Sequence, residues 1–211
     1  SQRVAQLLIK LSFNHHSALD VGCAVGGTAF ELAKTFQHVD AFDFSEKFIA
    51  TAERIQEGHC VKFPVRIEGE LYKEAVVSDV SHEDRINFFT GDACKLVESV
   101  PSKTHQYDAV VLANLLCRIP DPDACLQGLS QIVKKGGVVL MVTPFSWLEE
   151  YTPREKWIGG KNGTRGVFVL QKRMDALGFE KIHDEEMPLV IREHQRKYQW
   201  IVSKATGWKK K

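Results

Sequence analysis

The stretch Asp20-Val21-Gly22-Cys23-Ala24-Val25-Gly26 decides the fold of this chain. It closes a short apolar run at residues 18–21 and precedes a segment of helical character at residues 29–35, for which Thr28 is the expected N-cap. Glycine lets the backbone approach a ligand closely, and unpaired N–H groups where a helix begins favour negative charge. A strand, a tight glycine turn and a helix together predict a site for a nucleotide-like ligand.

Outward from this turn, apolar runs alternate with segments of helical period over most of the chain. Strands are expected at residues 18–21, 39–42, 86–89, 107–113, 138–142, 180–187 and 199–204, and helices at residues 2–13, 46–57, 124–133 and 167–177. Strands that alternate with helices need crossover connections, which predicts a parallel sheet. Because 211 residues suit a single domain, we expect one α/β domain over residues 1–211.

Three segments stand outside the alternation. Residues 58–85 contain the alternating run Val61-Phe63-Val65-Ile67, typical of an edge strand, but residues 68–82 show no clear period. We interpret residues 58–85 as an insertion and residues 144–166 and 187–198 as segments on the substrate side. Such connections commonly carry binding residues.

The composition argues against several classes of protein. With 28 Lys and Arg against 27 Asp and Glu, the formal net charge is +1, so no nucleic acid or anionic membrane is expected as a partner. No apolar stretch approaches the ~20 residues of a transmembrane helix. The five cysteines form no C-x-x-C pair and no zinc-like spacing with histidine. We therefore expect reduced thiols, no metal and a cytoplasmic location.

Polar residues recur where the expected strands end. Asp43 and Phe44 follow the second strand, Asp92 and Ala93 follow the third, and Asn114 ends the fourth. Ligands of open α/β sheets bind at the edge where parallel strands end. Together with the D-x-G-x-x-x-G pattern, these positions resemble the cofactor motifs of class I S-adenosylmethionine-dependent methyltransferases. The pattern differs from the G-x-G-x-x-G of dinucleotide enzymes.

That resemblance implies a Rossmann-like fold with a seven-stranded, mostly parallel sheet, helices on both faces and S-adenosyl-L-methionine as the cofactor. Asp43 would accept hydrogen bonds from both ribose hydroxyls, and Asp92 would lie beside the adenine amino group. A backbone N–H of Ala93 or Cys94 would meet a ring nitrogen, and Asn114 would lie under the transferable methyl group. The implied cofactor-binding residues are Asp20, Gly22, Cys23, Gly26, Asp43, Phe44, Asp92, Ala93 and Asn114.

A closer resemblance rests on longer runs of sequence. They are the glycine stretch, Phe30-Glu31-Leu32-Ala33, Ile67-Glu68-Gly69-Glu70-Leu71, Gly91-Asp92-Ala93-Cys94, Ala113-Asn114-Leu115, residues 143–153 and Ile191-Arg192-Glu193-His194-Gln195-Arg196-Lys197. Through them, residues 18–208 resemble the methyltransferase domain of ovothiol biosynthesis (4-mercaptohistidine N1-methyltransferase), the C-terminal part of 5-histidylcysteine sulfoxide synthase. Gly27 departs from the usual pattern, in which a bulkier or polar residue follows the second glycine.

The closer resemblance implies N-methylation of the imidazole ring of 5-thiohistidine, at the nitrogen nearest the side chain, to give ovothiol A. It also implies fusion to an iron-dependent sulfoxide synthase domain in the full-length protein. A chain that opens at Ser1 without Met fits a domain cut from a longer protein.

An α-amino-acid acceptor needs a cation for its carboxylate and hydrogen-bond acceptors for its ammonium group and ring N–H. Arg192 is the expected carboxylate anchor, because a guanidinium group is bidentate and always charged. Glu149 would accept from the ammonium group or the ring N–H, and Trp147 or Tyr151 would stack on the imidazole. The candidate catalytic residues are Glu149, Arg192, Trp147 and Tyr151, with Glu68 and Glu70 as competing acceptors.

Other functions remain open from sequence. The chain could methylate a different small amino-acid-like acceptor, or it could bind the cofactor without catalysing a reaction. A nicotinamide oxidoreductase is disfavoured, because that class predicts the absent G-x-G-x-x-G pattern.

Overall fold

The computed structural model describes residues 1–77, 83–101 and 106–211. Its strands are β1 (Ser17–Val21), β2 (His38–Asp43), β3 (Val61–Glu68), β4 (Leu71–Val77), β5 (Ile86–Thr90), β6 (Tyr107–Ala113), β7 (Val133–Thr143), β8 (Phe179–His194) and β9 (Lys197–Lys210). Its helices are α1 (Gln2–Leu11), α2 (Gly27–Ala33), α3 (Glu46–Gln56), α4 (Leu96–Ser99), α5 (Pro122–Ile132) and α6 (Gly166–Ala176). Short 3₁₀ turns occupy Glu83–Arg85, Ala93–Lys95, Leu116–Arg118 and Arg154–Lys156.

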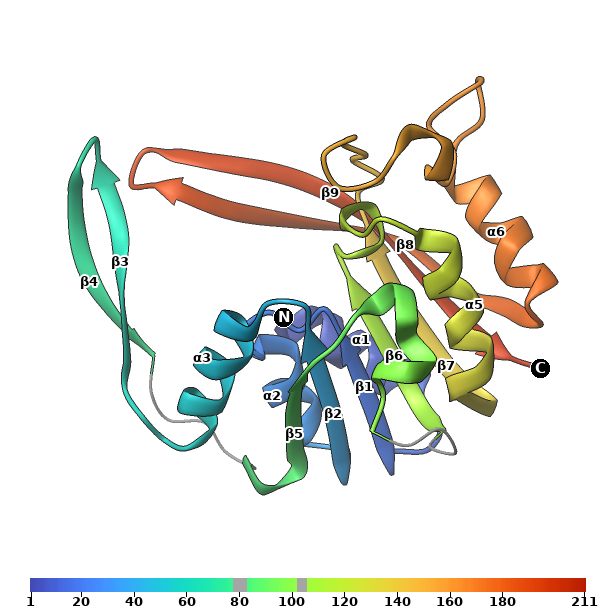
Figure 1. Cartoon of the computed structure of the whole chain (residues 1–211), viewed down its shortest axis with the longest axis horizontal. Helices are drawn as coiled ribbons and strands as arrows, with labels where there is room; N and C mark the ends of the chain where they lie inside the picture. Colours follow the sequence, from blue (N-terminus) through green and yellow to red (C-terminus); the bar gives the residue numbers. More distant parts are fainter. Residues whose placement is uncertain (78–82, 102–105) are drawn as a thin grey trace.

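The main sheet has seven strands in the order β5-β2-β1-β6-β7-β9-β8 (Figure 1). Strand β9 runs antiparallel to both neighbours, and the other paired strands are parallel. The predicted seven-stranded, mostly parallel α/β fold is therefore confirmed.

Helices cover both faces of the sheet, each over its own apolar core. Helices α1, α2 and α3 bury Leu8, Leu32 and Ile49 against one face. Helices α4, α5 and α6 pack Leu96, Leu129 and Leu170 against the other. The sheet is buried on both sides, which explains why β1 and β6 read as continuous apolar runs.

The register brings the carboxyl ends of the parallel strands to one edge. Val21 of β1 lies opposite Phe42 of β2 and Leu112 of β6, so the residues that follow these strands are neighbours. Asp43 in turn lies opposite Thr90 of β5. This edge is where an open α/β sheet binds its ligand.

Helix α2 begins earlier than its sequence suggests. Gly26 adopts a left-handed conformation with φ of 85° and is the N-cap, so Thr28 lies inside the first turn and is buried. The expected Thr28 cap is therefore wrong. The reason is that a glycine with positive φ can reverse the chain within the turn itself.

Two hairpins extend beyond the compact sheet. Strands β3 and β4 form a separate two-stranded sheet inside the expected insertion, so most of the segment that lacked a period is a strand; residues 78–82 lie outside the described residues. Strands β8 and β9 are much longer than predicted and continue past the end of β7. The two hairpin turns meet above the carboxyl edge, where the Gln195 N–H donates to the Ile67 carbonyl at 3.2 Å (Figure 1).

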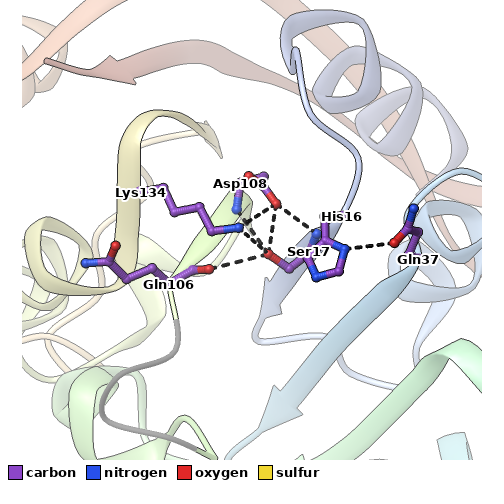
Figure 2. Close-up of polar contacts among 6 residues, drawn as sticks. All are labelled: His16, Ser17, Gln37, Gln106, Asp108 and Lys134. Carbon is purple, nitrogen blue, oxygen red and sulfur yellow. Dashed lines mark hydrogen bonds and ion pairs between the residues drawn. The ribbon is translucent and has the colours of Figure 1, made fainter.

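A polar cluster stabilises the sheet at the end opposite to the carboxyl ends of the parallel strands (Figure 2). Asp108 of β6 accepts hydrogen bonds from the backbone and hydroxyl of Ser17 at 3.0 Å and pairs with Lys134 of β7 at 2.9 Å. Burial alone would raise the pKa of Asp108, but Lys134 and Ser17 outweigh it and lower that pKa. The cluster ties β1, β6 and β7 together away from the ligand edge.

Candidate functional site

The glycine turn after β1 needs glycine at two positions. Gly22 has a φ of 73°, and a Cβ there would lie 2.7 Å from Leu115 Cδ1. Gly26 has a φ of 85°, and a Cβ there would lie 2.6 Å from Phe88 Cζ. Both backbones are held in the left-handed region that favours glycine, so the sequence pattern has a steric cause.

Asp43 ends β2 with both carboxylate oxygens oriented by the backbone. Its Oδ2 accepts the N–H of Ala24 at 3.0 Å, and its Oδ1 accepts the N–H of Ser45 at 2.9 Å. Each oxygen retains a second acceptor site. The carboxylate can therefore receive two neighbouring hydroxyl groups.

Asp20, at the glycine turn, is only 2% exposed. The backbone N–H of Ala29 hydrogen-bonds to its carboxylate, but the buried Oδ2 has no partner among the described residues. Burial, with a smaller contribution from the nearby Asp43, raises the pKa of Asp20 to about 7. An unsatisfied buried carboxylate oxygen is costly, so a cationic ligand group beside Asp20 would be stabilised.

Asp92 follows β5 and caps a 3₁₀ turn. Its Oδ1 accepts the N–H of Cys94 at 2.8 Å. Of the two backbone donors expected to face an adenine ring, that of Cys94 is therefore already used, which leaves the N–H of Ala93.

Two cavities open along this edge and share Gly22. The first, about 550 Å³, is lined by Asp20, Cys23, Asn114 and residues of α1 and β8; we call it the Asp20 cavity. The second, about 450 Å³, is lined by Asp43, Phe44, Asp92 and Ala93; we call it the Asp43 cavity. Of the nine predicted cofactor residues, only Gly26 lines neither cavity, and it shapes the turn between them.

The predicted substrate residues are not brought together. Tyr151 lines the Asp43 cavity, where Arg118 lies 5.1 Å from the centre of its ring. Trp147 is buried and stacks on Trp157 in the core beside α6, outside both cavities. Glu149 is exposed and lines neither cavity, whereas its neighbour Glu150 lines the Asp43 cavity.

Arg192 lies on the outer part of β8, exposed and opposite Tyr198 of β9, and it lines neither cavity. Its role as an anchor stays a prediction. Glu68 and Glu70 lie at the exposed turn between β3 and β4, also away from both cavities.

Sequence reasoning missed several residues that line the Asp20 cavity. Arg3 of α1 lines it, and its guanidinium group donates to the carbonyl of Pro188 in β8. Met187 and Leu189 of β8 form an apolar part of the wall of the same cavity. No local signal marks Arg3, because its position depends on the packing of α1 against α2, β6 and β7.

An open parallel sheet with a glycine turn after β1 and carboxylates beyond β2 and β5 defines a Rossmann-like nucleotide-binding protein. The chain belongs to the methyltransferase domain family, which matches residues 19–139, from β1 into β7. Within the described residues, no group of three His, Cys, Asp or Glu side chains is arranged to hold a metal ion. The same residues include no helix long and apolar enough to cross a membrane.

Curated relatives are longer proteins. The tRNA N(3)-cytidine methyltransferase METTL2 of Mus musculus is 28% identical over 179 residues, which cover 79% of this chain and 41% of that protein. The corresponding protein of Bos taurus is 25% identical over the same share of this chain and 42% of its own length. The chain thus spans less than half of these relatives.

Solved structures share the fold. A S-adenosylmethionine-dependent methyltransferase from Methanosarcina mazei has a TM-score of 0.64 at 17% identity, with 96% of each chain covered. Magnesium protoporphyrin IX methyltransferase from Synechocystis PCC 6803, solved with S-adenosylmethionine bound, has a TM-score of 0.61 at 16% identity, covering all of this chain and 79% of that one. At these identities the likeness concerns the fold.

S-adenosyl-L-methionine is the cofactor, and the residues of the site fit it. The orphaned Oδ2 of Asp20 suits an ammonium group, and the oriented carboxylate of Asp43 suits a ribose diol. Asp92, the backbone of Ala93 and the exposed ring of Phe44 suit an adenine. The domain is a S-adenosylmethionine-dependent methyltransferase.

Proposed function

We propose that the domain transfers a methyl group to the ring nitrogen of 5-thiohistidine nearest the side chain, giving ovothiol A. One observation carries this proposal: three runs that resemble the ovothiol methyltransferases converge on the Asp20 cavity. Asp20 and Gly22 come from the glycine stretch, Asn114 follows β6, and Ile191 comes from the outer part of β8. These residues are far apart in the sequence, but all of them line the Asp20 cavity.

The size and lining of the Asp20 cavity support a small acceptor. At about 550 Å³ it falls in the range of small-molecule sites, and it has to hold the amino-acid end of the cofactor, at Asp20, as well as the acceptor. Val4, Met187 and Leu189 give it apolar walls, and Asp20, Asn114 and Arg3 supply a few polar groups. The exposed side chain of Arg3 donates to the Pro188 carbonyl at the wall of this cavity.

The protein contributes to methyl transfer by positioning the acceptor relative to the cofactor. S-adenosylmethionine supplies the electrophilic methyl group, and transfer requires the nucleophile to lie in line with it. The attacking imidazole nitrogen needs a free lone pair, so the site must bind the ring neutral or as a thiolate, with any proton on the other nitrogen. Asn114 follows the end of β6 in the wall of this cavity, where it can hold the acceptor.

We further propose that residues 1–211 act as a single methyltransferase domain of a cytoplasmic protein that also carries an iron-dependent sulfoxide synthase domain. This part of the proposal rests on the sequence resemblance alone.

The proposal is tested by offering purified protein equal concentrations of 5-thiohistidine and histidine and measuring methylated product by mass spectrometry. The sulfur makes the ring more electron-rich and fills more of the cavity, so we expect at least a tenfold preference, corresponding to about 1.4 kcal/mol. Equal rates for the two acceptors would contradict the ovothiol assignment.

Cytidine in tRNA is the second candidate acceptor, because the curated relatives are named for it. RNA binding draws much of its affinity from cationic contacts to phosphate, and a formal net charge of +1 provides little overall attraction. A third assay arm with total tRNA separates the two. Methylated tRNA without methylated 5-thiohistidine would replace our proposal, and cofactor binding with no turnover of any acceptor would indicate a non-catalytic domain.

A further inference from the structure

The hydroxyl of Ser203 donates to Oδ1 of Asn114 at 2.9 Å. Ser203 lies in β9 opposite Met187 of β8 and is fully buried. Asn114 directly follows β6, so this bond reaches across the end of β7 and joins parts of the chain 89 residues apart. A buried hydroxyl is costly to leave unpaired, and here its partner belongs to the Asp20 cavity.

The backbone of Asn114 is also fixed. Its φ is 57°, a left-handed conformation that asparagine tolerates better than most residues. Its N–H donates to the carbonyl of Val142 at 2.6 Å, which anchors it to β7. Its Nδ2 makes no hydrogen bond to the residues that the structure describes, although the residue itself is exposed and lines the Asp20 cavity.

We propose that Ser203 is a positioning residue that holds the Asn114 amide in one orientation, with Nδ2 rather than Oδ1 available to the methyl acceptor. An amide has one accepting end and one donating end. Since the Ser203 hydroxyl occupies the accepting end, the free end offers N–H donors.

This orientation selects the chemistry of the acceptor. A molecule placed beside Asn114 must present a lone pair or a negative charge to Nδ2, as a carboxylate or a thiolate does. A protonated amine would be disfavoured there. The identity of the acceptor rests on the proposed function, whereas the orientation of Asn114 does not.

The orientation is tested in the free protein by ¹⁵N NMR of side-chain amides. The Asn114 amide signals are identified by their absence from the spectrum of Asn114→Asp. In Ser203→Ala we expect these signals to shift and to show faster side-chain motion, and in Ser203→Thr, which keeps the hydroxyl, to resemble wild type. Thr206→Val removes another buried hydroxyl of β9 that bonds Trp208, and should leave the Asn114 signals in place.

Binding measurements supply the functional readout. Calorimetry with 5-thiohistidine in the presence of saturating S-adenosylhomocysteine should show about tenfold weaker binding for Asn114→Asp, which puts oxygens at both ends of the side chain. Ser203→Ala should lower kcat/KM for the acceptor by about tenfold through misplacement of Asn114, with the KM for S-adenosylmethionine unchanged.

Unchanged Asn114 signals in a folded Ser203→Ala protein would overturn the proposal. If Ser203→Ala fails to fold, undiminished acceptor binding by Asn114→Asp would overturn it instead. Should wild type bind no 5-thiohistidine, the same two variants are compared with whichever acceptor the domain methylates. Failure of the proposed function is thereby distinguished from failure of this inference.

Discussion

The Oδ2 atom of Asp43 accepts the backbone N–H of Ala24 at 3.0 Å, so the end of β2 is tied to the glycine turn that follows β1. Ala24 has a φ of 48°, and the bond helps to hold this unusual backbone. The same carboxylate therefore shapes the turn and faces the Asp43 cavity. Loss of Asp43 should weaken cofactor binding directly and through the turn.

Asp43→Ala should lower the affinity for S-adenosylhomocysteine about ten- to a hundredfold, because two ribose hydroxyls lose a charged acceptor worth about 1.5–3 kcal/mol. Calorimetric titration of wild type and variant measures the difference. Ser45→Ala is the matched control, since it removes the side-chain cap of α3 two residues after Asp43 and leaves the Asp43 carboxylate in place. Equal affinities of wild type and Asp43→Ala would exclude Asp43 from the site.

Cofactor affinity should depend on the protonation of Asp20. Its pKa in the free protein is raised to about 7 by burial, and an ammonium group binds the ionised form. Between pH 6 and pH 8 the ionised fraction rises about tenfold, so S-adenosylhomocysteine affinity should rise by a similar factor. Asp20→Asn should bind more weakly and lose the pH dependence. A wild-type affinity that does not change over this range would contradict the assignment of Asp20 to the ammonium group.

The raised pKa of Asp20 also predicts how the free energy of unfolding changes with pH. Between the ordinary value of 3.8 and about 7, the folded chain keeps a proton on Asp20 that the unfolded chain has released. Asp20 therefore contributes stability at low pH that is lost as pH rises through about 7. Urea unfolding of the cofactor-free protein at pH 5 to 8 should show a steeper fall in the free energy of unfolding for wild type than for Asp20→Asn. Parallel curves for the two proteins would show that Asp20 titrates normally.

Tyr151 should act on the cofactor side. The Arg118 guanidinium group lies over the ring of Tyr151 and donates to the Ser146 carbonyl at 2.6 Å. Both side chains line the Asp43 cavity. Tyr151→Ala should weaken S-adenosylhomocysteine binding about two- to fivefold, from a cation–π contact of about 0.5–1 kcal/mol, and Tyr151→Phe should retain it. Tyr198→Ala, at an exposed ring of β9, is the control. A raised acceptor KM with unchanged cofactor affinity would instead place Tyr151 beside the imidazole, as the sequence suggested.

The cofactor edge could be predicted because its signals are local. Buried parallel strands produce apolar runs, a left-handed turn requires glycine, and the residue after each strand lies at the edge by topology alone. Asp20, Asp43, Asp92 and Asn114 follow from these rules.

The acceptor side could not be predicted in the same way, because long-range contacts decide it. Trp147 is buried by stacking on Trp157, which no local pattern indicates. The lengths of β8 and β9 come from pairing with each other beyond β7, where their side chains are largely exposed and alternate little in polarity. Arg3 reaches the cavity through the packing of α1 against α2, β6 and β7.

Arg3 and Arg192 compete as the anchor for the carboxylate of an amino-acid acceptor. Both residues are exposed, but Arg3 lines the Asp20 cavity and donates to the Pro188 carbonyl, whereas Arg192 of β8 lines neither cavity. We therefore expect Arg3→Gln to raise the KM for 5-thiohistidine about tenfold or more, since a charge-assisted hydrogen bond contributes about 1.5–3 kcal/mol. Arg192→Gln should remain close to wild type.

Steady-state kinetics with each substrate varied in turn measure both variants, and thermal melting excludes misfolding. An acceptor analogue that lacks the carboxylate sharpens the comparison: wild type should discriminate against it, and Arg3→Gln should use it as well as it uses 5-thiohistidine. Arg3→Lys, which keeps the charge but not the planar guanidinium fork, should fall between the two. If Arg192→Gln alone raises the acceptor KM and abolishes discrimination against the analogue, the outer part of β8 closes onto the acceptor and Arg192 is the anchor, as its sequence context predicts.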